Sequence, residues 1–172
     1  MDDQELVLLL RHKRHDWMNQ IQLIQGYASL NKQDRVLEQL ENLKEEAEEE
    51  RKLLNCGAGS FIVWLETFNW KHDQLRIQYY FKEEIDLSRH DRIVTAYGKR
   101  LIEILEDHGA EGELYEGKVH LYKGFDPSAI GLSWEWEGLF HKSDDLKAQL
   151  EKEGWIATVF DDRELSIEMT LD

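Results

Sequence analysis

The fold is decided first by residues 17–28, which read WMNQIQLIQGYA. Apolar side chains recur there at spacings of 4, 3 and 4 residues, which places them as one seam on one face of a helix. The same spacing returns between residues 36 and 47. The two seams consist of Trp17, Ile21, Ile24 and Ala28, and of Val36, Leu40, Leu43 and Ala47. They predict two helices, at about residues 4–31 and 34–54.

The residues between the two seams, 30–34, read LNKQD and are typical of a short connection. Asn31 suits the position just after a helix, because asparagine tolerates the left-handed conformation. Asp34 suits the start of the next helix. A short connection makes the two helices antiparallel neighbours, so we expect a helical hairpin at residues 1–56.

Residues 56–60, CGAGS, are a stretch of small residues, and we predict a flexible domain boundary there. Beyond it, apolar and polar residues alternate over 75–81, which is typical of a half-buried strand. The expected helices are 61–70, 92–108 and 144–152, and the expected strands are 75–81, 118–125, 130–137, 155–160 and 165–171. Helices segregated from a mostly antiparallel sheet define an α+β fold, here at residues 61–172.

The composition excludes several classes of function. The chain has 172 residues, a net charge of −15 and a hydrophobic fraction of 41%, so it can bury a core and is not a disordered acidic tail. The negative charge disfavours nucleic acid as a partner, because binding it needs clustered Lys and Arg. No apolar run approaches the roughly 20 residues of a membrane span, and a single cysteine suits a reducing compartment. We expect a cytoplasmic protein that binds other proteins or a small molecule, and neither nucleic acid nor a membrane.

His15 points about 150° away from the seam of the first helix, toward solvent. The residues that share its side are His12, Asn19, Gln22 and Gly26. An exposed imidazole is mostly neutral at pH 7, and a neutral imidazole is a competent nucleophile. Two alternatives stay open from the residues alone: His15 is an ordinary polar surface residue, or it binds a metal with His12 and Asp16. The metal site is disfavoured, because it offers only two or three ligands in diverging directions.

The neighbours of this histidine suit a nucleophile. Asn19 lies one turn further on, where its amide can contact a group attached to the ring. Asp16 is expected to point sideways, toward a partner, and Gly26 leaves a flat spot for another backbone. Leu23 and Leu30 flank the same face. For these two leucines we favour burial against the second helix or a partner subunit, and an apolar docking patch is the alternative.

The segment Arg14-His15-Asp16-Trp17-Met18-Asn19, followed by IQLI at 21–24 and by Leu30, resembles the histidine box of the sporulation initiation phosphotransferase B family. These are the phosphorelay phosphotransferases of spore-forming bacilli. Weaker matches follow in the same order: DRV at 34–36, TFNWK at 67–71, DPS at 126–128 and LD at 171–172. The resemblance therefore runs over nearly the whole chain. The sequence begins close to the first expected helix, so we expect no longer N-terminal extension.

The resemblance implies a homodimer in which two hairpins form a four-helix bundle, followed by an α/β sandwich similar to a histidine-kinase ATPase domain without its nucleotide site. His15 then corresponds to the phosphorylated histidine of the family. It accepts a phosphoryl group from the aspartate of one response regulator and passes it to the aspartate of a second one that controls sporulation initiation. Asn19 and Arg14 are candidates for orienting that group, and the candidate partner-binding residues are Asp16, Gln22, Leu23, Gly26 and Leu30. No cofactor or metal of its own is implied, because Mg²⁺ is expected on the regulators.

One alternative is a histidine kinase that uses ATP itself. Such a kinase needs a helix asparagine to hold Mg²⁺, and residues 92–108 contain none. A G-x-x-x-x-G-K-[ST] motif is absent as well. Asp107, Gly109 and Gly112 form the pattern D-x-G-x-x-G, but a helix C-terminal cap explains Gly109. A non-enzymatic four-helix scaffold is the other alternative. Trp134 and Trp136 fall on one face of an expected strand, and we assign them to the core.

Overall fold

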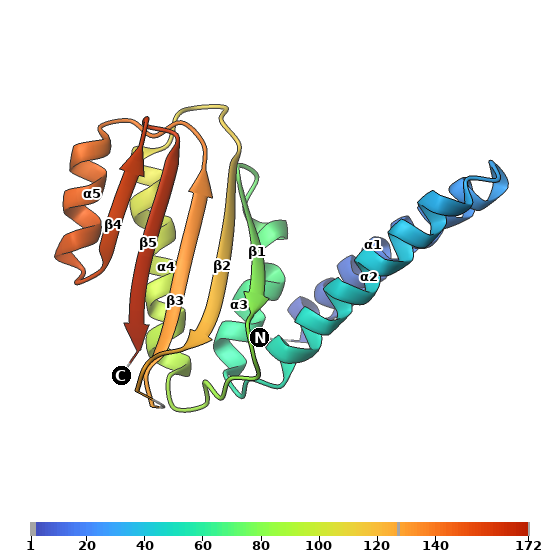
Figure 1. The fold of residues 1–172 in the computed structure, drawn as a ribbon, viewed down its shortest axis with the longest axis horizontal. Helices are drawn as coiled ribbons and strands as arrows, with labels where there is room; N and C mark the ends of the chain where they lie inside the picture. The colour runs from blue at the N-terminus through green and yellow to red at the C-terminus, as the bar shows by residue number, and fades with distance from the viewer. Residues whose placement is uncertain (1–2, 127, 172) are drawn as a thin grey trace. The chain divides into compact units, whose positions relative to one another are not determined.

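Figure 1 shows the computed structural model of the protein, which describes residues 3–126 and 128–171. The chain forms two compact units, one that ends at Glu50 and one that begins at Arg51. The first unit contains helix α1 (Asp3–Ser29) and most of helix α2 (Gln33–Leu54). Both helices lie close to their predicted ranges, and the last turn of α2 belongs to the second unit.

A tight turn joins the two helices of the hairpin. Asn31 has a φ of 54°, which confirms the left-handed conformation that the sequence predicts for it. The N–H groups of Arg35 and Val36 donate to the carbonyl of Lys32, both at 3.1 Å. Lys32 therefore holds the capping position of α2, and Asp34 lies within the first turn, where its charge complements the helix dipole.

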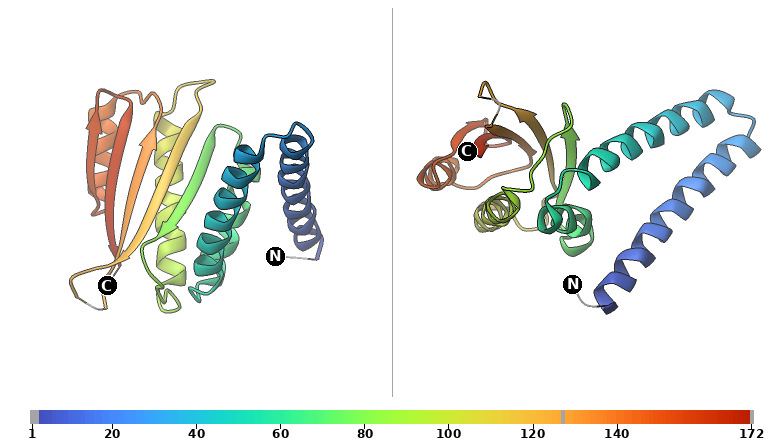
Figure 2. Two further views of the ribbon diagram at one scale, coloured as in Figure 1. Left: turned by 45° about the vertical axis from the view of Figure 1, so that its right-hand side comes forward. Right: turned by 90° about the horizontal axis from the view of Figure 1, so that it is seen from below.

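The hairpin buries little of its own surface. Figure 2 shows α1 and α2 diverging from the turn that joins them. Polar side chains link them: Gln39 donates to Gln20 at 2.7 Å, and Lys13 pairs with Glu50 at 2.8 Å. Within the described part of α1 no residue is buried. The half-buried residues are Leu9, Lys13, Gln20, Ile24 and Tyr27 in α1, and Val36, Gln39, Leu43, Glu49 and Glu50 in α2.

The second unit is a five-stranded sheet with three helices on one face (Figures 1 and 2). The helices are α3 (Gly59–Lys71), α4 (Asp91–His108) and α5 (Ser143–Lys152). The strands are β1 (Leu75–Phe81), β2 (Tyr115–Lys123), β3 (Ile130–Glu137), β4 (Ile156–Phe160) and β5 (Glu164–Leu171). Their order is β1-β2-β3-β5-β4; β1 and β2 are parallel and the other neighbours are antiparallel. The predicted α+β class and mostly antiparallel sheet are confirmed.

The core of the second unit lies between the sheet and its helices. Trp134 and Trp136 are at most 1% exposed, and their rings stack with centroids 6.1 Å apart. The Trp136 ring lies over Gly117 of β2, where an added Cβ would come within 2.6 Å of it. Only glycine leaves room for that ring, and the assignment of both tryptophans to the core is confirmed.

The predicted flexible boundary at residues 56–60 is wrong, because this segment is part of the core. Leu53, Cys56 and Ala58 are at most 1% exposed. The carbonyl of Cys56 accepts a hydrogen bond from the N–H of Leu87 at 2.7 Å, and burial raises the pKa of the Cys56 thiol. The segment is packed into the core at Cys56 and Ala58, whereas Gly57, Gly59 and Ser60 are exposed. The division between the two units falls within α2 instead.

Helix α3 has no capping side chain of its own, because the residue before it is Ala58. The carboxylate of Asp91, in the first turn of α4, accepts hydrogen bonds from the N–H groups of Ser60 at 3.2 Å and Phe61 at 3.0 Å. Partial burial of this carboxylate opposes ionisation, but the hydrogen bonds outweigh it and hold the pKa of Asp91 below its usual value. Helix α3 is therefore capped by a residue of α4.

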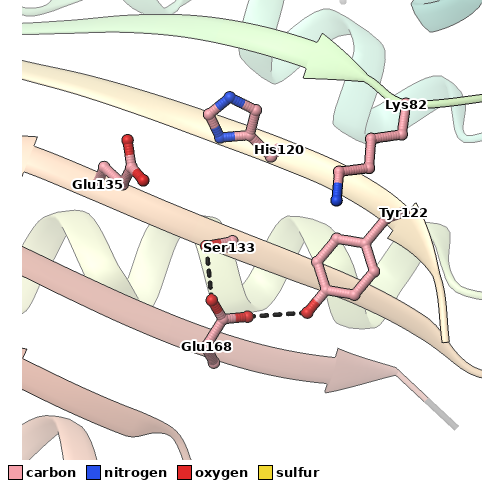
Figure 3. Close-up of a pocket in the computed structure, with 6 residues that line it drawn as sticks. All are labelled: Lys82, His120, Tyr122, Ser133, Glu135 and Glu168. Atoms are coloured by element: carbon pink, nitrogen blue, oxygen red, sulfur yellow. Dashed lines mark hydrogen bonds between the residues drawn. The ribbon is translucent and has the colours of Figure 1, made fainter.

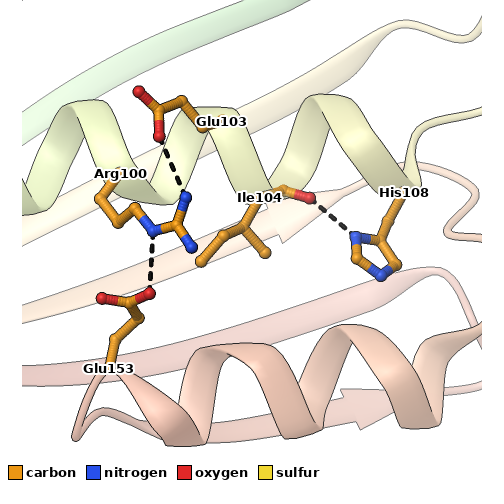
Figure 4. A network of polar contacts seen from close by, with 5 residues as sticks. All are labelled: Arg100, Glu103, Ile104, His108 and Glu153. Carbon is orange, nitrogen blue, oxygen red and sulfur yellow. Dashed lines mark hydrogen bonds and ion pairs between the residues drawn. The ribbon is translucent and has the colours of Figure 1, made fainter.

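Polar contacts along α4 also connect it to the end of α5 (Figure 4). The Arg100 guanidinium pairs with Glu103 at 3.1 Å and with Glu153 at 2.8 Å. His108 donates from Nδ1 to the carbonyl of Ile104 at 2.9 Å. Gly109 is the C-cap residue of α4, as predicted, and its N–H reaches the carbonyl of Glu106 at 3.4 Å.

Candidate functional site

His15 lies in the middle of α1, and its side chain is 72% exposed. Its Nδ1 atom is 3.3 Å from the amide nitrogen of Asn19 and 3.5 Å from Oδ1 of Asp16. The position of Asn19 agrees with its place one turn further on. The Asp16 carboxylate lies beside the imidazole ring and does not point away from it as expected, but its side chain is 59% exposed, so its contact with a partner stays a prediction. Three predicted site residues therefore form one cluster.

This cluster gives the two ring nitrogens of His15 different surroundings. The Asp16 carboxylate can accept a hydrogen bond from a protonated Nδ1, whereas the Asn19 amide can donate to Nδ1 only when that atom carries no proton. The contacts in the structure involve Nδ1, and the chain provides no polar partner for Nε2 among its described residues. When Nδ1–H faces the Asp16 carboxylate, the lone pair of the neutral ring is on Nε2. Nε2 is therefore the ring nitrogen that has no partner within this cluster.

The other predicted partner-binding residues lie on the same helix but contact none of these three. Leu23 is 42% exposed and Leu30 is 64% exposed, so the expected burial against the second helix is wrong, and burial by a partner subunit stays a prediction. Gln22 is exposed, and an added Cβ at Gly26 would meet no atom within 4 Å. The flat spot predicted at Gly26 is therefore open to solvent. These residues are available to a partner.

Arg14 is exposed, and within residues 3–126 and 128–171 it forms no hydrogen bond or ion pair. Successive residues of a helix are turned by about 100° from each other, so Arg14 and His15 leave the helix in different directions. The structure therefore does not bring Arg14 to the ring. Its proposed role in orienting a phosphoryl group stays a prediction.

The seam of α1 is also open to solvent. Trp17 is 73% exposed, Ile21 is 41% exposed, and Leu10 on the same side is 60% exposed. On α2, Leu37 and Leu40 are exposed as well. Large apolar side chains that share one face of a helix mark an interaction surface more often than a solvated one. We call this group of five residues the open seam.

The described part of the chain contains no metal cluster and no membrane helix. Among residues 3–126 and 128–171, no three His, Cys, Asp or Glu side chains are placed to hold a metal ion. The helices described in that range are too short or too polar to cross a membrane.

A second polar site lies in the sheet of the second unit, and sequence analysis missed it. Figure 3 shows the Glu168 carboxylate accepting hydrogen bonds from Ser133 at 2.6 Å and from Tyr122 at 2.8 Å. Burial and the neighbouring Glu168 raise the pKa of Tyr122. The hollow at this place measures about 350 Å³ and is lined by Lys82, His120, Tyr122, Ser133, Glu135 and Glu168. These residues come together only through the strand register, which no local sequence pattern reveals.

Comparison with known proteins first gives the class of the hairpin. Residues 1–56 match the family model described as Sensor_kinase_SpoOB-type, alpha-helical domain. The match covers both helices and the His15 cluster.

A particular relative supports the same class. The chain is 40% identical over 103 residues to sporulation initiation phosphotransferase B of Bacillus subtilis (strain 168). The matched region covers 59% of this chain and 54% of that protein, so the chain spans about half the length of the curated relative. The resemblance seen in the sequence is confirmed over these 103 residues.

Two solved structures with low sequence identity also match. The blue-light activated histidine kinase of Erythrobacter litoralis EL346 has a TM-score of 0.47 and 10% identity, over 95% of this chain and 59% of that chain. The histidine kinase AdeS of Acinetobacter baumannii has a TM-score of 0.40 and 13% identity, over 92% of this chain and 97% of that chain.

Proposed function

We propose that this protein is a phosphotransferase of a sporulation phosphorelay, which carries the phosphoryl group on His15. One observation supports the proposal above all. An exposed imidazole, with its Nδ1 beside Asn19 and Asp16, lies within the region that matches the family model. The donor is the phosphorylated aspartate of one response regulator. The acceptor is the aspartate of a second regulator that controls sporulation initiation, and the exchange takes place in the cytoplasm.

The proposed step is an in-line displacement at phosphorus. The lone pair of Nε2 forms the new N–P bond, and the P–O bond to the donor aspartate breaks, so the carboxylate leaves with the bonding electrons. The ring keeps its proton on Nδ1 and becomes positively charged. The Asp16 carboxylate, 3.5 Å from Nδ1, stabilises that charge. Transfer to the second regulator is the same displacement in reverse.

This chain contributes a positioned nucleophile, and the regulators supply the rest of the charge neutralisation. The transition state spreads negative charge over three equatorial oxygens, so positioning and cations are the main catalytic factors. In the proposal, the Mg²⁺ bound by each regulator supplies the cation, and the protein needs no metal or cofactor of its own. In the proposal, the Asn19 amide, which lies one turn from His15 and 3.3 Å from Nδ1, turns to donate to a phosphoryl oxygen once the phosphoryl group is present.

We also propose that the protein acts as a homodimer whose hairpins pair through the open seam. No described residue of α1 is buried, although the helix carries several large apolar side chains. Two hairpins packed at about 20° bury such faces in one four-helix core. Because His15 points away from the seam, each bundle would present two histidines to solvent.

The test is a transfer assay with a response regulator carrying radiolabel on its aspartate. The wild-type protein should acquire label without ATP, and His15→Gln should acquire none, because the imidazole nucleophile is gone. His12→Gln is the matched control, since it removes an imidazole from the same helix, and it should keep most of the activity.

Three results would overturn the proposal. Label on the His15→Gln variant would place the acceptor elsewhere. Label that appears only when ATP is added would indicate a histidine kinase. Binding of the regulator without any transfer would indicate a scaffold.

A further inference from the structure

Arg11 lies one helical turn before His15, on nearly the same side of α1. Four residues advance a helix by about 6 Å and turn it by about 40°, so Arg11 and His15 are surface neighbours. Asn19 occupies the equivalent position one turn after His15, and it contacts the ring at 3.3 Å. Arg14, the arginine adjacent in sequence, leaves the helix about 100° away. Of the two arginines, Arg11 is the one on the His15 side.

The Arg11 guanidinium is exposed and has no partner in the described part of the structure. Arg14 is unpaired in that part as well, in a chain with 36 acidic and 21 basic residues. Some other basic side chains of the helices are paired: Lys13 with Glu50 at 2.8 Å and Arg100 with Glu153 at 2.8 Å. The position that Arg11 faces along its helix holds the His15 imidazole, and the Asp16 carboxylate lies 3.5 Å from Nδ1 of that ring. A positive charge is therefore available next to the proposed nucleophile.

Basic side chains elsewhere in the protein reach forward along a helix to a negative group. Arg35 contacts Glu38 at 2.7 Å, three residues on. Lys147 contacts Glu151 at 3.8 Å, four residues on, at the spacing that separates Arg11 from His15. A phosphoryl group on His15 would place a negative charge at that position. Contact between Arg11 and a phosphoryl group on His15 would therefore use the same helical spacing as the Lys147–Glu151 pair.

We infer that Arg11 binds the phosphoryl group when His15 carries it, and thereby stabilises the phosphorylated state. The inference rests on the proposed function, since it assumes that His15 is the phosphorylated residue. The guanidinium donates hydrogen bonds to phosphoryl oxygens, and its planar fork suits them better than an ammonium group does. Asn19 donates from the opposite side along the helix. Arg11 and Asn19 thus hold the phosphoryl group from the turn before and the turn after the histidine.

The test phosphorylates the protein chemically, so it needs no response regulator. Phosphoramidate modifies exposed histidines, and the ³¹P resonance that is missing from His15→Gln identifies phospho-His15. Titrating that resonance with pH gives the midpoint at which the phosphoryl group takes up a proton. A neighbouring cation lowers this midpoint, and for an exposed pair the effect is about half a pH unit.

We expect the midpoint to rise by about that amount in Arg11→Gln and to stay near the wild-type value in Arg11→Lys. Lys13→Gln is the matched control: it removes one positive charge from the same helix, at a residue that pairs with Glu50, and should leave the midpoint nearly unchanged. An unchanged midpoint in Arg11→Gln, or a larger rise in Lys13→Gln than in Arg11→Gln, would overturn the inference. The readout is independent of the transfer assay, so a failure of the proposed function and a failure of this inference can be told apart.

Discussion

Replacing Asp91 tests the claim that α3 is capped by a residue of the neighbouring helix. The carboxylate accepts the N–H groups of Ser60 and Phe61 at 3.2 and 3.0 Å, which are the groups that an N-cap side chain normally satisfies. Loss of a helix cap costs about 1 kcal/mol, up to about 2. Asp91→Asn keeps an acceptor but loses the charge, so it should lower the free energy of unfolding by about 1 kcal/mol. Asp91→Ala should lower it by about 2 kcal/mol.

The effect of Asp91→Asn should depend on pH. The pKa of Asp91 in the folded protein is lower than in the unfolded chain, because the hydrogen bonds from α3 outweigh the effect of burial. The unfolded chain therefore binds more protons near this pKa. The stabilisation is fully present above the unfolded value of about 3.9 and is lost as pH falls through the folded value. The difference between wild type and variant should be large at pH 7 and shrink below about pH 4.

Urea unfolding followed by far-UV circular dichroism, at pH 7 and at pH 3.5, measures this difference. Asp73→Asn is the control, because Asp73 is exposed, makes no contact in the described structure and carries the same charge. It should change the free energy of unfolding by less than about 0.5 kcal/mol. Equal stability of wild type and Asp91→Asn at pH 7 would refute the capping argument. A difference that persisted undiminished at pH 3.5 would refute its electrostatic part.

Two further predictions concern the hairpin. Gly26→Ala should stabilise α1 by about 1 kcal/mol in thermal unfolding, because alanine favours a helix interior and its Cβ meets nothing within 4 Å. The same variant should slow phosphoryl transfer several-fold. An unchanged transfer rate would show that Gly26 is not part of the surface that binds the response regulator. Light scattering at micromolar protein concentration should show a dimer for the wild type and a monomer for Trp17→Glu. Gln22→Glu, on the opposite side of α1, is the control and should stay dimeric. A monomeric wild type would contradict pairing through the open seam.

The hairpin helices and β1 could be predicted from the sequence because each has a clear period, whereas β2, expected at 118–125, lies at Tyr115–Lys123. The alternation in 75–81 gave the bounds of β1, and the seams gave α1 and α2 to within a few residues. The error at 56–60 has a physical cause. Glycine, alanine and serine are typical both of flexible linkers and of places where elements pack closely, and composition does not separate the two. Here the buried Cys56 and Ala58 show the second case.

The site was predicted less completely than the fold. Helical spacing was sufficient to place Asn19 beside His15, because i and i+4 side chains are surface neighbours. It failed for Asp16, because a direction on a helical wheel does not describe how a short side chain bends toward its neighbour. The hollow around Glu168 could not be predicted, since it depends on which residues of β2, β3 and β5 lie opposite one another.

The position of Leu53 has a consequence for how this protein can be cut and recombined. A fragment that begins after the glycines, at residue 61, would lack Leu53, Cys56 and Ala58, which fill the core of the second unit. Such a fragment would have a cavity in its core where these side chains belong. Each missing large side chain lowers the free energy of unfolding of a small domain by several kcal/mol. An independently folding piece should therefore begin at Arg51, inside a helix. If the hairpin is exchanged between relatives, in nature or by engineering, the junction should lie at Arg51. The last turn of α2 would then stay with the second unit.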